Sequence, residues 1–267
     1  MLTPSDKFEI HAPKKYLEYT ETPAYRAFRD RENQSSGASN FAVLKSLEGA
    51  DQSIAAVEAY YAGMRSVPKF MFPADAAPPA QARIPLTKAG YVLCRRPAVR
   101  MHLEARPSPL LAAHKCPVVM AGGPLAMPAA SLLQEYGEGQ DFALKLIDRQ
   151  LAKGARAFVA LNRAEVPVSI CVGLGYADAF CIQVLYTAQT QRRQGYGAAV
   201  LLAALAWAKA PEQAYGEIFL DCGADEEDAP ARRLFEKAGF AGAQAPMYGA
   251  FQSLVPPGWQ QCTGEEF

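Results

Sequence analysis

The stretch Cys181–Ala208, CIQVLYTAQTQRRQGYGAAVLLAALAWA, joins three kinds of local sequence. Residues 181–187 are apolar, β-branched or aromatic, which predicts a strand. Polar residues 189–194 follow and include two adjacent arginines, and the run after Gly195 and Gly197 is helix-forming throughout. Because the first amides of a helix have no internal partner and lie at the positive end of its dipole, this order of segments predicts a backbone anion site.

The spacing of the glycines distinguishes between known kinds of phosphate-binding turn. A P-loop requires G-x-x-x-x-G-K-[ST], which the chain lacks. A dinucleotide-binding turn requires G-x-G-x-x-G, and Val200 stands where its third glycine would be. The pattern that remains is [Q/R]-x-x-G-x-[G/A], met by RRQGYG at residues 192–197. With the strand before it, this segment resembles the pyrophosphate loop of the GNAT acyl-CoA N-acyltransferases.

A second motif lies downstream, in the order and at the distance expected for that family. Residues 218–222 predict a strand and residues 228–238 a helix, with Asp228 as its N-cap. Within the helix, the segment 231–240, ARRLFEKAGF, resembles the A-x-x-L-Y-E-K-x-G-F signature of GNAT proteins. The resemblance implies an α+β fold, in which a mixed, mostly antiparallel sheet is flanked by helices.

The resemblance also implies a cofactor, coenzyme A in the form of acetyl-CoA. Backbone amides of residues 194–198 are expected to hold its pyrophosphate, while Arg192 and Arg193 add positive charge. The strand backbone at residues 184–186 is expected to pair with the pantetheine arm as an added strand would. The implied cofactor-binding residues are Val184, Leu185, Tyr186, Arg192, Arg193, Gln194, Gly195, Tyr196, Gly197 and Ala198.

No catalytic base is evident in the sequence. Family members commonly carry a Glu on the central strand, where this chain offers Cys181, Gln183 and Tyr186. Asp178, just before the strand, is the nearest acid, although a turn aspartate is the ordinary interpretation of such a residue. Three further acids lie in or beside the helices expected over the acceptor pocket, where they would bind a cationic substrate or act through a water: Glu135, Glu138 and Asp141.

The acid that protonates the leaving thiolate is also not given by the motif. Phe235 stands at the position where many GNAT enzymes have a Tyr, so Tyr186, Tyr196 and Tyr248 are the available substitutes. The coenzyme A thiolate can also leave without an acid, because a thiol with a pKa of about 8.5 gives a tolerable leaving group. The catalytic candidates are Tyr186, Asp178 and Tyr248.

Composition limits the other functional classes. The 267 residues have a formal net charge of zero and are 50% hydrophobic, which favours a sizeable core and gives no electrostatic reason to expect nucleic acid or an anionic membrane as partner. The sequence shows no signal-peptide pattern and no apolar run long enough to span a bilayer. Six cysteines without a C-x-x-C pair and three histidines indicate reduced thiols, no metal site and a cytoplasmic location.

The N-terminal half contains a faint repeat of the C-terminal half. The segment LTKAGY at 86–91 matches FEKAGF at 235–240, and at the same offset Pro97 falls on Pro246. Residues 1–40 are expected to be irregular, followed by regular elements at 40–45, 53–64 (with Ser53 as N-cap), 67–72 and 80–88. The turn before Gln52 has one glycine, Gly49, and no arginine, so this half is expected to be a degenerate GNAT-like domain without its own cofactor.

The expected division is therefore a degenerate domain at 1–120 and a catalytic domain at 121–267. In the second, residues 129–136 and 141–151 predict two helices, followed by strands at 156–163 and 167–176. Residues 200–207 are apolar on nearly every face, which predicts a helix covered on both sides by a neighbouring domain or a homodimer partner.

The leading hypothesis is an N-acetyltransferase that moves the acetyl group of acetyl-CoA to a primary amine of a small molecule or amino compound. Two alternatives stay open: a transferase of longer acyl groups, and a non-catalytic protein that binds acyl-CoA as a sensor or partner subunit. The loop residues serve all three, so they do not distinguish between them.

Overall fold

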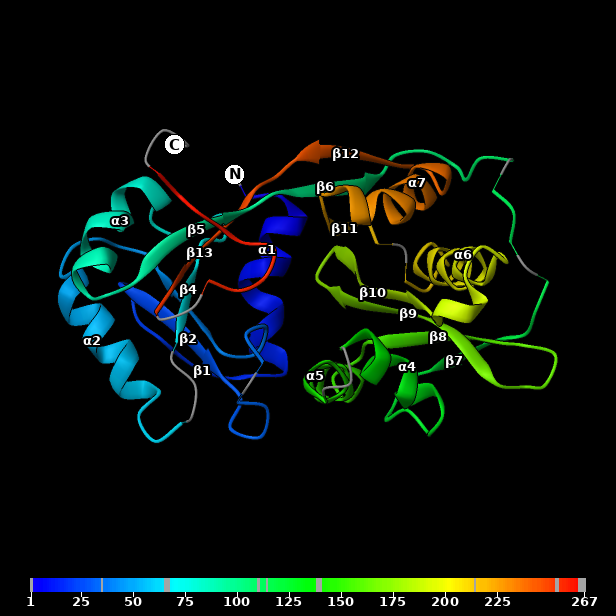
Figure 1. The fold of residues 1–267 in the computed structure, drawn as a ribbon, viewed down its shortest axis with the longest axis horizontal. Coiled ribbons are helices and arrows are strands. Elements are labelled where there is room, and N and C mark those ends of the chain that lie inside the picture. Colours follow the sequence, from blue (N-terminus) through cyan, green and yellow to red (C-terminus); the bar gives the residue numbers. More distant parts are fainter. Residues whose placement is uncertain are drawn as a thin grey trace. The chain divides into compact units, whose positions relative to one another are not determined.

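The chain forms two compact units, which a computed structural model describes over residues 2–34, 36–64, 68–109, 111–113, 115–137, 141–213, 215–252 and 255–263. The first unit combines Met1–Ala98 with Ala245–Phe267, and the second unit is the continuous segment Val99–Gln244. Figure 1 shows the path of the chain through each. Every helix of the described residues is too short or too polar to span a lipid bilayer.

The first unit has a seven-stranded sheet in the order β1-β2-β3-β4-β13-β5-β14. Its strands are β1 (Glu18–Glu21), β2 (Tyr25–Arg29), β3 (Phe41–Leu44), β4 (Lys69–Met71), β5 (Val92–Arg96), β13 (Met247–Phe251) and β14 (Gln260–Gln261). Its helices are α1 (Pro4–His11), followed by a 3-10 turn at Ala12–Lys15, α2 (Ala50–Tyr60) and α3 (Pro79–Lys88). In Figure 1, α2 and α3 cover one face of this sheet and α1 the other. Apolar residues of α2 and α3, such as Ile54 and Leu86, form a buried core with Phe70 of β4.

The second unit has its own seven-stranded sheet, in the order β12-β6-β11-β10-β9-β8-β7. Its strands are β6 (Ala98–Leu103), β7 (Val118–Ala121), β8 (Arg156–Leu161), β9 (Pro167–Tyr176), β10 (Ala179–Thr187), β11 (Glu217–Gly223) and β12 (Phe240–Gln244). Its helices are α4 (Ala129–Tyr136), α5 (Phe142–Leu151), α6 (Tyr196–Ala208) and α7 (Ala229–Lys237), with 3-10 turns at Gln189–Gln191 and Glu226–Asp228. Helices α6 and α7 lie on one face of the sheet and α4 and α5 on the other (Figure 1). Several apolar side chains of α6, among them Val200 and Leu201, are fully buried in the core beside β8, β9 and β10, whereas Ala206 is exposed.

The two units repeat one order of elements. In the first unit β3, α2, β4, α3 and β5 follow one another, as β10, α6, β11, α7 and β12 do in the second. Both sheets also place one parallel pair at the same point, β3 with β4 and β10 with β11, within ladders that are otherwise antiparallel wherever the pairing is recorded. This arrangement confirms the predicted fold class, a mixed and mostly antiparallel α+β fold in two halves.

Each sheet contains strands from the other half of the sequence, β13 and β14 in the first sheet and β6 in the second. Strand β6 follows β5 along the chain, yet it lies between β11 and β12 of the second sheet. Strand β13 follows β12, yet it lies between β4 and β5 of the first sheet. Pro97 and Pro246 occupy the two crossing points. The observed units therefore differ from the predicted division at residue 120, because the strand after each proline pairs with the other sheet.

Two predictions about the N-terminal region are wrong. Residues 1–40 are not irregular, because Thr3 and Asp6 form a reciprocal capping box that starts α1, and two strands follow. Helix α2 begins at Ala50 rather than at Ser53, since Gly49 takes a left-handed conformation (φ 62°) at its N-cap and leaves Ser53 buried inside the helix. The helices predicted at 129–136 and 141–151 and the strand predicted at 167–176 are present within one residue of their expected bounds.

Candidate functional site

A cavity of about 910 Å³ opens in the second unit beside the start of α6. It is lined by the turn between β10 and α6, by one face of α7 and by residues 111–113 and 115, which precede β7. The lining residues are Leu111, Ala112, Ala113, Lys115, Leu185, Tyr186, Thr187, Gln191, Arg192, Arg193, Gln194, Gly195, Tyr196, Gly197, Ala198, Glu227, Pro230, Ala231, Arg233, Leu234 and Lys237. Nine of the ten predicted cofactor-binding residues are among them.

The tenth predicted residue, Val184, does not line the cavity. Its side chain is 6% exposed and belongs to the buried part of β10. Successive side chains of a strand point to opposite faces, so a ligand that follows the main chain of β10 passes Val184 without meeting its side chain.

The turn before α6 has an unusual backbone that aims amides toward the cavity. Arg193 (φ 62°) and Gly195 (φ 87°) are both in the left-handed region, and Gly195 is the N-cap of α6 without any side-chain cap. The first amides of α6, which have no partner within the helix, therefore lie at a lining position without a side-chain cap from Gly195. Gly197 has no side chain to fill this part of the cavity, and a Cβ at this position would lie 3.1 Å from Thr187 Oγ1. Such alternation of backbone conformation and a bare helix start are typical of a phosphate-binding nest.

Strands β10 and β11 pair only at their beginnings. Their parallel ladder joins Ala179–Cys181 to Glu217–Phe219, whereas β10 continues to Thr187 and β11 to Gly223. The register of β10 against β9 also shifts between Ile182 and Val184, which marks a bulge at Gln183. Beyond the ladder, β10 has no recorded strand pairing with β11, and Leu185 to Thr187 of this part line the cavity. The carbonyls of Tyr186 and Thr187 accept hydrogen bonds from the Ser169 hydroxyl and the Arg192 guanidinium. An extended ligand with amide groups can pair there.

Tyr186 links the cavity to helix α4. Its hydroxyl donates a hydrogen bond to Glu135 Oε2 (3.1 Å), and its ring lies 5.8 Å from the Arg192 guanidinium and 6.0 Å from the ring of Tyr136. Burial raises the pKa of the Tyr186 phenol, and the hydrogen bond to the Glu135 carboxylate raises it further. Tyr186 therefore keeps its proton at neutral pH, as a proton donor must.

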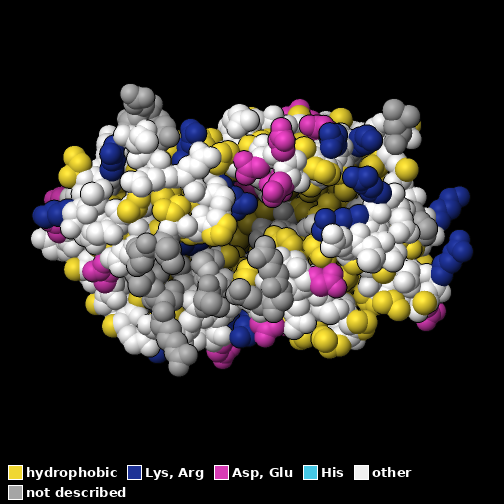
Figure 2. All heavy atoms as spheres, in the orientation of Figure 1, with side chains coloured by type: hydrophobic (Ala, Val, Ile, Leu, Met, Phe, Trp, Pro, Cys, Tyr) yellow, Lys and Arg dark blue, Asp and Glu magenta, His cyan; other side chains and the backbone are white. Residues whose placement is uncertain are grey.

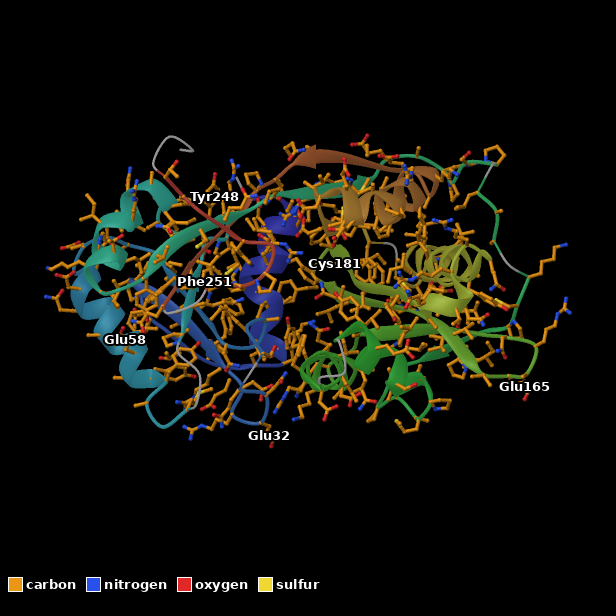
Figure 3. All side chains as sticks on the ribbon, in the orientation of Figure 1. Glu32, Glu58, Glu165, Cys181, Tyr248 and Phe251 are labelled. Atoms are coloured by element: carbon orange, nitrogen blue, oxygen red, sulfur yellow. The ribbon has the colours of Figure 1, made fainter. Side chains whose placement is uncertain are left out.

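The other two predicted catalytic residues lie elsewhere. The Asp178 carboxylate accepts a hydrogen bond from the amide of Gly216 (2.8 Å), and its main-chain oxygen accepts one from Glu217, so it fixes the start of β11 next to β10. Tyr248 belongs to β13 of the first unit, opposite Arg95 of β5 (Figure 3). Neither residue lines the cavity.

The remaining acids have ordinary contacts. Asp141 precedes α5 and accepts a hydrogen bond from Gln134 (3.0 Å), while Glu138 lies outside the described residues. Phe235 of the second motif is buried against Phe240 in the core and is not a lining residue. The cavity therefore offers no tyrosine at that position.

Sequence reasoning missed two features of the site. One is a set of lining cations outside the α6 turn, namely Lys115, Arg233 and Lys237. The other is Gln150 of α5, which is 1% exposed and donates to Gln183 in the bulge (3.4 Å). For the cations, the sequence offered a visible signal, because Arg233 and Lys237 are four residues apart within the second motif. Nothing local in the sequence pointed to the second.

Comparison with known proteins agrees with this geometry. Residues 129–240 match the model of the Acetyltransferase (GNAT) family. A GCN5-related N-acetyltransferase from Kribbella flavida superposes with a TM-score of 0.62 at 14% identity, over 92% of this chain and 93% of that one. A functionally unknown conserved protein from Staphylococcus epidermidis gives 0.60 at 11% identity, over 91% and 96%. A tandem GNAT protein from the clavulanic acid biosynthesis pathway gives 0.57 at 12% identity, over 85% and 78%. No curated protein matches the sequence.

Residues 129–240 of the second unit thus match the GNAT family model, and the whole chain shares its fold with these solved structures. The matched residues include strand β10, the turn before α6 and helix α7, which line the cavity.

Proposed function

We propose that the protein is an N-acetyltransferase that transfers the acetyl group of acetyl-CoA directly to a primary amine of a small molecule or amino compound. The observation that carries this proposal is one cavity that joins the bare start of α6 to the unpaired edge of β10. The start of α6 suits a pyrophosphate, and the edge of β10 suits the amide groups of pantetheine. These two groups follow each other in the same order along coenzyme A.

In the proposed reaction the amine nitrogen forms a bond to the thioester carbon, and the carbon–sulfur bond breaks. Amides on the open edge of β10 would stabilise the charge that develops on the carbonyl oxygen. The Tyr186 hydroxyl would give its proton to the departing sulfur and recover it from solvent. The proton lost by the amine would leave to water, because the Glu135 carboxylate accepts a hydrogen bond from the Tyr186 hydroxyl and Glu227 lies in the turn before α7.

The acceptor is proposed to be a small molecule, and the location cytoplasmic, on the grounds of neutral net charge and reduced cysteines. The carboxylate of Glu135 next to Tyr186 supports a cationic acceptor, because it places negative charge where an ammonium group would approach.

Calorimetric titration with acetyl-CoA, coenzyme A and a longer acyl-CoA tests the cofactor assignment. Micromolar binding with one site per chain is expected, and failure of all three to bind would refute the proposal. Thiol release over a panel of amines then tests transfer, with Tyr186→Phe expected to lower the rate about 100-fold while leaving acetyl-CoA affinity within about twofold.

A second function, non-catalytic binding of acyl-CoA as a sensor, is favoured by one observation. Phe235 lies in the core and leaves no acid at the position where many family members have one. Tight acetyl-CoA binding without thiol release from any amine would support this function instead.

A further inference from the structure

Three cations outside the α6 turn also line the cavity. Arg233 and Lys237 project from α7 and Lys115 from the segment before β7, and we call these three residues the basic wall. Their side chains make no hydrogen bond or ion pair with any other residue in the described part of the chain. Figure 2 shows Lys and Arg side chains gathered over the region of α6 and α7.

Other cations of the same unit are used in the fold. Arg100 forms a bidentate ion pair with Asp221 (2.8 Å for each bond), and Arg232, the neighbour of Arg233, donates to the carbonyls of Gly223 and Asp225. Arg192 donates to the Thr187 carbonyl at the entrance to the turn (3.1 Å). Helix α7 is therefore anchored by Arg232, while the basic wall has no structural contact to explain it.

The arrangement of the basic wall has an energetic cost in the absence of an anion. Arg233 and Lys237 are four residues apart on α7, so their charges are neighbours on one helix face and repel each other. The same face carries Ala231 and Leu234 toward the cavity, which keeps the cations at its rim. A doubly charged phosphate bound between them would convert this repulsion into attraction.

The turn before α6 accounts for only part of the charge on coenzyme A. Its amides and arginines face one diphosphate, whereas coenzyme A bears a further phosphate on its ribose. That group needs cations separate from the turn, and the basic wall is the unpaired set in the same cavity.

We propose that the basic wall binds the 3′-phosphate of coenzyme A, so that the protein distinguishes coenzyme A thioesters from those of dephospho-coenzyme A. This proposal rests on the proposed function and adds to it a specificity-determining subsite formed by Arg233 and Lys237 of α7 and by Lys115. The α6 turn alone binds both compounds, and the basic wall adds affinity only for the one with the extra phosphate.

The test is calorimetry of the full chain with coenzyme A and with dephospho-coenzyme A. For the wild type, coenzyme A is expected to bind about tenfold more tightly, which corresponds to two exposed charge pairs. In Arg233→Ala/Lys237→Ala the affinities for the two compounds should become equal, by loss of coenzyme A affinity alone. Raising the salt concentration should narrow the wild-type difference and leave the variant unchanged.

The control is Lys153→Ala/Lys209→Ala, which removes two exposed cations of the same unit that do not line the cavity. It should keep the tenfold difference. Equal wild-type affinities, or a difference that survives in Arg233→Ala/Lys237→Ala, would overturn the basic wall while leaving the proposed function intact. If neither compound binds the wild type, both proposals fall.

Discussion

Gly195 and Gly49 hold the same place in the two units. Each is the N-cap of the helix that follows the first strand of the parallel pair, and each is in the left-handed region. A residue with a Cβ is strained by roughly 1–2 kcal/mol in that conformation, so both positions favour glycine for a structural reason. Only the turn of the second unit adds arginines, Arg192 and Arg193, and it alone is predicted to bind the cofactor.

Substitution at these glycines separates binding from backbone strain. Gly195→Glu should lower affinity for coenzyme A by about 100-fold or more, because it places a carboxylate against the pyrophosphate. Gly49→Glu imposes the same strain in the first unit and should leave that affinity unchanged, as calorimetry can show. An equal loss in both variants would mean that general destabilisation, not the turn, causes the effect.

The polar cluster around Glu21 gives the first unit a pH-dependent stability. Although burial raises the pKa of Glu21, hydrogen bonds from Lys14 and Lys45 outweigh it and lower the pKa to about 2. Glu21 also contacts the buried Arg26, which has a bidentate pair with Asp75. Because the folded-state pKa lies below the ordinary 4.5, the stabilisation is present above about pH 4.5 and is lost as the pH falls through 2.

Glu21→Gln should therefore destabilise the protein by about 1–2 kcal/mol at pH 7, after allowance for partial exposure. The difference from the wild type should disappear near pH 2. Urea unfolding at a series of pH values measures it, and a difference that stays constant with pH would contradict the ionic explanation.

At the residue scale, the sequence predicted those parts of the site that are formed by consecutive residues. The turn 192–198 could be read because a motif of consecutive backbone positions needs no tertiary information. Lys115 and Lys237 could not, since a lysine that lines a cavity looks the same in sequence as a solvated one. Tyr248 was grouped with the site only by residue type, and its place on β13 depends on strand pairing that no local pattern contains.

At the scale of elements, the separation of β10 from β11 is the feature that makes room for a ligand. Asp178 sets the point at which the two strands are joined, through the Gly216 amide. Gly216 is itself required there, since a Cβ would lie 2.3 Å from the Asp178 carboxylate. The ladder therefore starts from a fixed hydrogen bond and ends after Cys181, which Figure 3 marks on β10.

Asp178→Ala is a test of whether this residue is structural or catalytic. Loss of the bond to Gly216 should destabilise the chain by about 1–3 kcal/mol, seen as a lower melting temperature. The rate of thiol release should stay within a few-fold of wild type at temperatures where the variant is folded. A 100-fold loss of rate in a stable variant would restore Asp178 as a catalytic candidate.

Elements were predicted best where apolar residues followed a clear helical or strand pattern. Strand β9 and helix α4 have the bounds expected from their patterns. Helix α1 was missed because its buried residues, such as Phe8 and Ile10, are interspersed with charges over only two turns. The sequence evidence for α1 was the capping pair Thr3 and Asp6. This pair marks where a helix starts, whereas the helices were predicted from the periodicity of apolar residues.

At the scale of the whole molecule, the reciprocal placement of β6 and β13 decides what counts as a folding unit. Each strand lies inside the sheet to which the other half of the sequence contributes most strands. The alignment of Pro97 with Pro246 was visible in the sequence, but the crossing at these positions was not, because pairing partners distant in sequence leave no local pattern.

Fragments cut at residue 120 should not fold separately. Fragment 1–120 lacks β13 and fragment 121–267 lacks β6, so each sheet would have a gap next to its second parallel strand. Neither fragment alone should show a cooperative thermal transition by circular dichroism, whereas their mixture should regain one. A fragment 121–267 that melts cooperatively and binds coenzyme A would contradict this.

The exchange of strands also bears on how the chain is made. The ribosome releases β4 and β5 early, yet β13, the strand that separates them in the finished sheet, is translated roughly 150 residues later. At ordinary elongation rates the nascent first unit waits roughly 10–30 s with two strand edges open. Newborn chains of this protein should therefore depend on chaperones that shield such edges, more than their modest size would suggest.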